Sequence, residues 1–163
     1  MSGKTDLGVG FLGAIPYVAG FIGMAVIGWS SDRFQERKWH FAATQFLAAA
    51  ALVLAVTLAH SLTISIILFA VFGFSICGEM PCIWALPGAF LSDSAAATSV
   101  GFIGGVGSIG GFVGPYLMGF LNGRTGSFTA GLIYMVGSLI VAGSLVLFCP
   151  RERAIIPLPS RSR

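Results

Sequence analysis

The sequence predicts an all-α membrane protein with five transmembrane helices. Of its 163 residues, 56% are hydrophobic and 9% are charged, and the mean hydropathy is +0.91. Soluble domains usually carry about 25% charged residues, and one of this length could not bury so much apolar surface. Five stretches reach the roughly 20 apolar residues that a helix needs to cross a bilayer. No stretch shows the sustained polar/apolar alternation of a membrane β-barrel.

The five predicted spans follow one another along the chain with short connections. They lie approximately at residues 7–30, 40–59, 62–91, 95–121 and 128–149. Residues 1–150 are therefore expected to form a single membrane domain. Residues 151–163 are expected to be a disordered cytoplasmic tail, because their prolines oppose the extension of a helix.

A run of charges separates the first span from the second. Residues 28–38, GWSSDRFQERK, place five charged side chains in seven positions. If this loop is cytoplasmic, only Lys4 and Arg124 of the nine basic residues lie outside, as the positive-inside rule requires. We therefore expect the N-terminus outside the cell and the C-terminus in the cytoplasm.

The acid in this loop is placed against the helix dipole. Arg33 near the C-terminal end of the first span suits the dipole, whereas Asp32 does not. Asp32 therefore needs a partner, either a nearby arginine or the N-terminal end of another helix. The residues alone leave open whether the loop makes specific contacts or is only a solvated, positive-inside connection.

The third span is the longest and contains Pro81 and Pro87. Its 30 residues would extend about 45 Å at 1.5 Å per residue, beyond a hydrocarbon core of about 30 Å. Each internal proline removes one helix hydrogen bond, so we predict an interrupted helix. Interrupted helices near the midplane often mark transport sites. Trp84 in this span and Tyr17 in the first could line such a site, although packing is the alternative for both.

Glu79 is the only Asp, Glu, Lys or Arg within a predicted span. An ionised side chain at the bilayer centre costs about 2.5–3.5 kcal/mol on insertion scales, and such residues often serve as proton relays. One hypothesis is that Glu79 faces a cavity and couples proton movement to a substrate. The alternative is a permanently neutral acid, hydrogen-bonded to a carbonyl group that Pro81 leaves free.

The fourth span is rich in glycine. In lipid, small residues let helix backbones approach closely, so we expect tight packing of this helix, and a smooth face could also permit sliding. Pro115 predicts a bend. No strand precedes the glycines and no Lys-Ser/Thr follows them, which excludes a phosphate-binding loop. The glycines four residues apart are Gly101/Gly105, Gly107/Gly111 and Gly110/Gly114.

No cofactor, metal or nucleic acid is expected. Cys77, Cys82 and Cys149 lie in apolar sequence at spacings that suit neither a redox motif nor a zinc site. We expect them to be small buried residues. The basic residues are not interleaved with aromatic residues as in nucleic-acid-binding proteins.

The charged loop resembles a known motif. Gly28, Asp32, Arg33, Arg37 and Lys38 match the loop pattern G-x-x-x-D-R-x-x-x-R-[RK] of the major facilitator superfamily. There the acid and the bases act as a latch that holds the cytoplasmic helix ends together in one state of the transport cycle. Further matching pieces, in the expected order, resemble the anion:cation symporter branch, which includes permeases for phthalate, tartrate and 4-hydroxyphenylacetate. These pieces are AIPYVAGFIGM, SDRFQERKWH, WALPGAFLS, GGFVGPYLMG and GRTGSFTAG.

The resemblance implies both a topology and a function. The five spans correspond to helices eight to twelve of a twelve-helix transporter, so the N-terminal half would be a partner that this sequence does not include. The implied function is secondary active transport of a small organic anion with a coupling proton or other cation, in a bacterial inner membrane. Gly104 and Ser108 stand where relatives tend to carry asparagines, and Ser108 is a further candidate for the pathway.

Two functional classes other than transport are alternatives for this sequence. The chain could be a non-transporting membrane protein, such as a truncated remnant or an assembly subunit. A membrane enzyme is disfavoured, because His40 and His60 are expected on opposite sides of the bilayer and neither HExxH nor GxSxG occurs.

Overall fold

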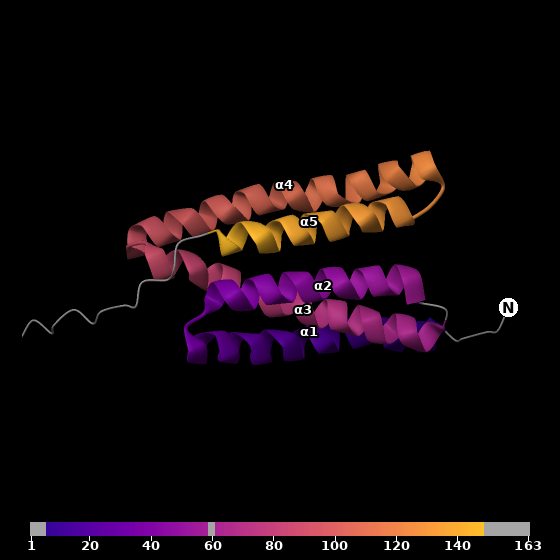
Figure 1. The fold of residues 1–163 in the computed structure, drawn as a ribbon, viewed down its shortest axis with the longest axis horizontal. Coiled ribbons are helices and arrows are strands. Elements are labelled where there is room, and N and C mark those ends of the chain that lie inside the picture. Colours follow the sequence, from indigo (N-terminus) through magenta and orange to yellow (C-terminus); the bar gives the residue numbers. More distant parts are fainter. Residues whose placement is uncertain (1–5, 59–60, 149–163) are drawn as a thin grey trace, which may run out of the picture.

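The computed structural model describes residues 6–58 and 61–148, which form five α-helices (Figure 1). Their order and number within the described residues confirm the predicted fold class. Outside the described residues lie Lys4, His60, Cys149 and the expected tail at 151–163. The helices are α1 (Asp6–Phe34), α2 (Arg37–Leu58), α3 (Leu62–Phe90), α4 (Asp93–Thr125) and α5 (Thr129–Leu147).

The helices form a three-helix group with a two-helix layer beside it. Helix α3 packs against both α1 and α2, and α2 packs in turn against α5. Helix α4 lies at the outer edge, where it contacts α5 and the end of α3 (Figure 1). Along α2, the residues that face its neighbours are mostly small, including Ala48, Ala49 and Ala51, so this helix is the most enclosed.

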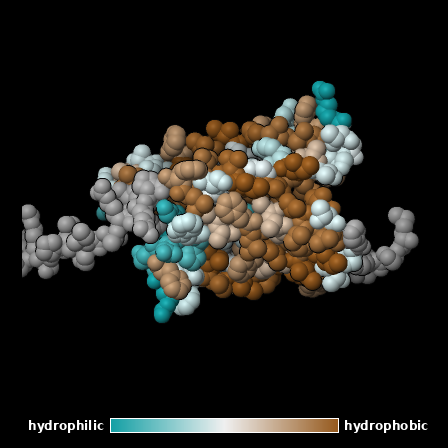
Figure 2. All heavy atoms as spheres, viewed as in Figure 1, coloured by the Kyte–Doolittle hydropathy of each residue, from teal (hydrophilic) through white to brown (hydrophobic). Residues whose placement is uncertain are grey.

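Every helix is long and apolar enough to span a membrane. Figure 2 shows hydrophobic side chains across the middle of the visible face and hydrophilic ones gathered toward its two ends. Large apolar side chains such as Phe21, Phe102 and Phe112 are about three-quarters exposed, which lipid rather than water can accommodate. The chain is therefore a multi-pass membrane protein.

The described helices do not break at their prolines. Helix α3 runs through Pro81 and Pro87, and α4 runs through Pro115, so the predicted interruption of the third span is not observed. Membrane helices tolerate proline because neighbouring helices and local adjustments satisfy the backbone groups that the ring frees. Pro87 itself still accepts a hydrogen bond, at 3.0 Å, from the backbone N–H of Leu91.

Glycine-mediated packing occurs between α1 and α3 rather than along α4. A Cβ atom on Gly23 would collide with the backbone carbonyl of Phe74, and one on Gly73 would collide with that of Pro16. A Cβ on Gly20 would lie 2.6 Å from the Cys77 sulfur. These two helices therefore cross with their backbones almost in contact, as small residues allow in membranes.

The glycine-rich face of α4 has no such partner within the described part of the chain. Apart from the backbone of their own turns, no atom lies within 4 Å of a Cβ built on eight of its glycines, and α4 has no buried residue among those described. The tight packing that the sequence predicted for this helix is therefore absent from the five-helix arrangement. The eight are Gly101, Gly105, Gly107, Gly110, Gly111, Gly114, Gly119 and Gly123.

Candidate functional site

The charged segment between α1 and α2 folds into a tight hairpin of two helices. Only Gln35 and Glu36 separate them, and Gln35 has a left-handed backbone with φ 53°. The Gln35 side chain donates a hydrogen bond of 2.6 Å to the backbone carbonyl of Asp32, one of the last α1 carbonyls without a helical partner. This contact compensates for a backbone conformation that a non-glycine residue seldom adopts.

Asp32 finds its partner across this hairpin. The Arg37 Nη2 atom donates to Asp32 Oδ1 at 3.2 Å, so the last turn of α1 is tied to the first turn of α2. The expected need of Asp32 for a nearby arginine is met in this way. The Asp32 side chain is 69% exposed and that of Arg37 is 19% exposed. An ion pair exposed on one side is worth about 0.2–1 kcal/mol, which is weak enough to break during a conformational change.

A second link between the two helices runs through His40. Its Nδ1 atom lies 2.9 Å from the backbone carbonyl oxygen of Glu36 and therefore donates a proton to it. In the neutral ring Nε2 is then the acceptor, and it receives a hydrogen bond of 2.9 Å from the Ser30 hydroxyl. The ring also stacks on Phe34. His40 thus supports the hairpin, a role that the sequence did not reveal.

The remaining bases of the motif lie beside aromatic rings. The Arg33 guanidinium stands 5.6 Å from the centre of the Trp29 ring, and the Lys38 ammonium stands 5.8 Å from that of Trp39. Cations held over tryptophan faces are stabilised by the ring quadrupole. Tryptophan and basic residues are enriched at the membrane–water boundary, so these pairs place the hairpin at that boundary.

The motif glycine connects the hairpin to α3. A Cβ on Gly28 would lie 3.2 Å from the Pro81 ring, so the two residues pack directly together. One turn after Gly28 on α1, the side chain of Ser31, a residue 2% exposed, lies beside the fully buried thiol of Cys82, the residue that follows Pro81. Cys82 therefore meets the expectation of a small buried residue, whereas Cys77 is only partly buried.

Glu79 lies one turn before Cys82 on α3, within electrostatic reach of the same thiol. Its carboxyl group is partly buried, and its Oε2 atom has no hydrogen-bond partner among the described residues. Arg37 and Asp32 act electrostatically on Cys82 as well. Glu79 thus lies one turn from Cys82, beside the point where Gly28 and Ser31 at the hairpin end of α1 pack on α3, which the sequence did not predict.

The other three candidate lining residues lie elsewhere. Trp84 packs toward Gly104 of α4, whose built Cβ would be 3.6 Å from the indole ring. The Ser108 hydroxyl, which is exposed, donates to the Gly104 carbonyl of its own helix at 2.9 Å. Tyr17 on α1 is 80% exposed and is not brought to either of these residues.

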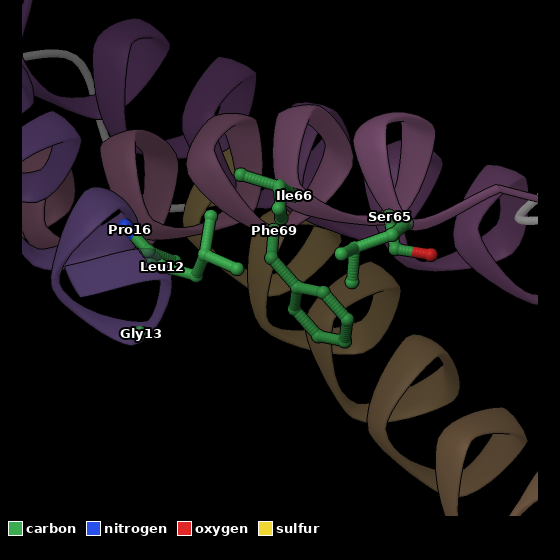
Figure 3. A pocket seen from close by; sticks show the side chains of 7 residues that line it. Leu12, Gly13, Pro16, Ser65, Ile66 and Phe69 are labelled. Atoms are coloured by element: carbon green, nitrogen blue, oxygen red, sulfur yellow. The ribbon is translucent and has the colours of Figure 1, made fainter. Parts of the chain in front are cut away.

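A groove of about 420 Å³ lies between the beginning of α1 and the beginning of α3 (Figure 3). Its walls are almost wholly apolar, with the Ser65 hydroxyl as the polar exception. No basic residue lines it, so it offers nothing to hold a carboxylate. The lining residues are Leu12, Gly13, Pro16, Leu62, Ser65, Ile66 and Phe69.

Known proteins similar to this chain are all named as transporters or transport proteins. The family model described as Major Facilitator Superfamily matches residues 3–162. The chain is 36% identical over 150 residues to a putative tartrate transporter of Agrobacterium vitis. This match covers 92% of the chain and 33% of the transporter. It is 36% identical over 145 residues to a quinolone resistance transporter of Acinetobacter baumannii, covering 89% of the chain and 33% of the relative.

A third relative is the putative metabolite transport protein NicT of Pseudomonas putida, 37% identical over 144 residues. This match covers 88% of the chain and again 33% of the relative. The chain therefore spans about a third of the length of the curated relatives it matches.

Proposed function

The chain belongs to the major facilitator superfamily, and from this premise we propose that it is part of a secondary active transporter for a small organic anion. The observation that carries the proposal is the Asp32–Arg37 ion pair, formed inside the family's loop motif and joining two helix ends. A contact of this strength suits a latch that closes in one state of the transport cycle and opens in another.

The relatives support an organic acid as the substrate class. Their names include tartrate transporters and a probable galactarate/D-glucarate transporter of Escherichia coli. Tartrate, galactarate and glucarate are all carboxylates that carry several hydroxyl groups. All the described Lys and Arg residues lie at helix ends and none lies in the middle of a span. We therefore propose that a carboxylate is bound with the help of basic groups from a second helical bundle, and that the two bundles rock about a site between them.

The coupling ion and the topology are also proposals. Glu79 is the acid best placed to accept and release a proton within the membrane, which favours proton symport. The basic hairpin favours a cytoplasmic position, with the N-terminus outside, in a bacterial inner membrane. Since the relatives are named as transporters, we propose transport rather than enzymatic catalysis as the activity.

A chimera tests the proposal. The matching third of the Agrobacterium vitis tartrate transporter is replaced by this chain, and uptake of labelled tartrate and other hydroxy acids is measured in cells. We expect uptake, and we expect Glu79→Gln to remove its dependence on the proton gradient. The matched control is Thr57→Ala, an exposed hydroxyl near the far end of α2, which should leave uptake unchanged.

The main alternative is a membrane protein without transport activity, such as a remnant or an assembly subunit. A chimera that inserts and folds but moves none of the tested acids favours this alternative. Export of quinolones by the same chimera would instead point to a role like that of the Acinetobacter baumannii relative, whose name specifies quinolone resistance.

A further inference from the structure

Three neighbouring helices near the charged hairpin each carry a buried polar atom without a strong hydrogen-bond partner. These atoms are Ser31 Oγ on α1, Arg37 Nε on α2 and Glu79 Oε2 on α3, each buried and each unpaired within the described structure. The fully buried Cys82 thiol lies beside Ser31, close enough for a weak hydrogen bond at most, and Glu79 precedes Cys82 by one turn of α3. Three helices that pack on one another thus each hold an unsatisfied polar atom near their common junction beside Cys82.

Such an arrangement is costly if it is dry. An unsatisfied buried polar group costs about 1–3 kcal/mol, and more when it is charged. Buried waters typically make about three hydrogen bonds to groups of this kind. The chemistry of the three atoms suits water, since Arg37 Nε can only donate, an ionised carboxylate only accepts, and the Ser31 hydroxyl can do either.

A metal cation is a poorer occupant of this junction. The Arg37 guanidinium is always charged, and its repulsion of a second cation at close range is strong in a partly desolvated site. Ser31 and Glu79 alone would leave a sodium or magnesium ion with few oxygen ligands. Neutral water satisfies all three atoms without introducing charge.

We infer that Ser31, Arg37 and Glu79 enclose a small hydrated site against the Cys82 thiol, and that its water links Glu79 to the Asp32–Arg37 ion pair. Arg37 is the connecting residue, because its Nη2 donates to Asp32 at 3.2 Å while its Nε is buried and has no partner among the described residues. The water site rests on the burial and the missing partners of these atoms, whereas its use in transport rests on the proposed function.

In transport, the site would carry protons between Glu79 and the hairpin. A water molecule in the site donates one of its protons to the Glu79 carboxylate and takes another from the next water toward the surface, so no net charge is left behind. Once Glu79 is neutral it competes less for Arg37, and the Asp32–Arg37 pair is favoured. Loss of the proton restores the competition and weakens that pair.

The native cysteines report on this water by infrared spectroscopy. In the 163-residue chain reconstituted in lipid, Cys77→Ala with Cys149→Ala leaves Cys82 as the only thiol. After transfer to D2O, replacement of its S–H band by an S–D band measures contact with water. The matched control is Cys82→Ala with Cys149→Ala, which leaves Cys77, whose sulfur packs against Gly20 at the crossing of α1 and α3.

We expect the Cys82 thiol to exchange at least tenfold faster than Cys77, although it is the more buried of the two. Ser31→Ala combined with Glu79→Leu should slow Cys82 to nearly the Cys77 rate, while Thr57→Ala should leave it unchanged. If the double variant does not fold, Ser31→Ala alone, which removes one oxygen atom, replaces it in the test. This single variant should slow the exchange of the Cys82 thiol at least threefold.

Equal slow exchange of the two thiols shows a dry junction and overturns the inference. Rapid Cys82 exchange that survives both Ser31→Ala and the double variant shows that water arrives by another route and overturns the assigned residues. These measurements need no substrate, so a chimera without uptake would remove the proposed function and leave the water site standing.

Discussion

Replacement of Gly23 by alanine should separate α1 from α3. The added Cβ would meet the backbone carbonyl, C and Cα atoms of Phe74, none of which can rotate away as a side chain could. Overpacking of a fitted contact typically costs about 1–3 kcal/mol. Alanine regains about 0.5–1 kcal/mol of helix propensity over glycine, so we expect Gly23→Ala to lose up to about 2 kcal/mol.

The matched control is Gly13→Ala on the same helix, where no atom lies within 4 Å of the built Cβ. This variant should keep the propensity gain and be as stable as the parent chain or slightly more so. Unfolding of both variants in mixed detergent, followed by circular dichroism, measures the difference. A loss of 1.4 kcal/mol is a tenfold change in the unfolding equilibrium, which such an assay resolves.

Equal stability of the two variants would refute the close crossing of α1 and α3. It would mean that the helices stand far enough apart for a methyl group at position 23, and that Gly20 and Gly73 do not mark a contact. The packing of Pro81 on Gly28, which aligns α3 with the charged hairpin, would then also lose its basis.

Further outcomes follow from the remaining contacts. Gly105→Ala on the open face of α4 should leave the stability of this chain unchanged or raised by up to about 1 kcal/mol, measured by the same unfolding assay; a marked loss would reveal a packed partner for that face. Asp32→Asn should cost no more than about 1 kcal/mol, and its effect should shrink at high salt, whereas a larger loss would show that the ion pair is a structural brace rather than a weak latch. His40→Phe keeps the stacking on Phe34 but removes two hydrogen bonds, and should cost about 1–3 kcal/mol in the same measurement; an unchanged stability would contradict the assigned bonds. Single cysteines at Arg37 and Arg124, each in a chain without other cysteines, should react with an impermeant thiol reagent from opposite sides of sealed vesicles, and reaction of both from one side would overturn the topology.

The sequence by itself determined the number of helices and the membrane as their surroundings. Uninterrupted apolar length and scarce charge are properties of each segment alone, because a backbone in lipid must satisfy its hydrogen bonds within the segment. The loop motif was also visible, as was the need of Asp32 for a partner, since a helix dipole acts on a nearby charge whatever the rest of the fold. The interruption predicted from the prolines of the third span was wrong, because neighbouring helices determine how much a lost helix hydrogen bond costs.

Only the tertiary structure decided which helix faces meet. Glycines in α4 are more numerous and more regular than those in α1, yet the close approach involves Gly23 and Gly73, since packing depends on the shape of both partners and not on the small residues of one. Likewise nothing in the local sequence joins Glu79 to Arg37, which are 42 positions apart along the chain. Their meeting beside Cys82 depends on how far α3 slides along α1 and α2, and that register is fixed by contacts distant in sequence.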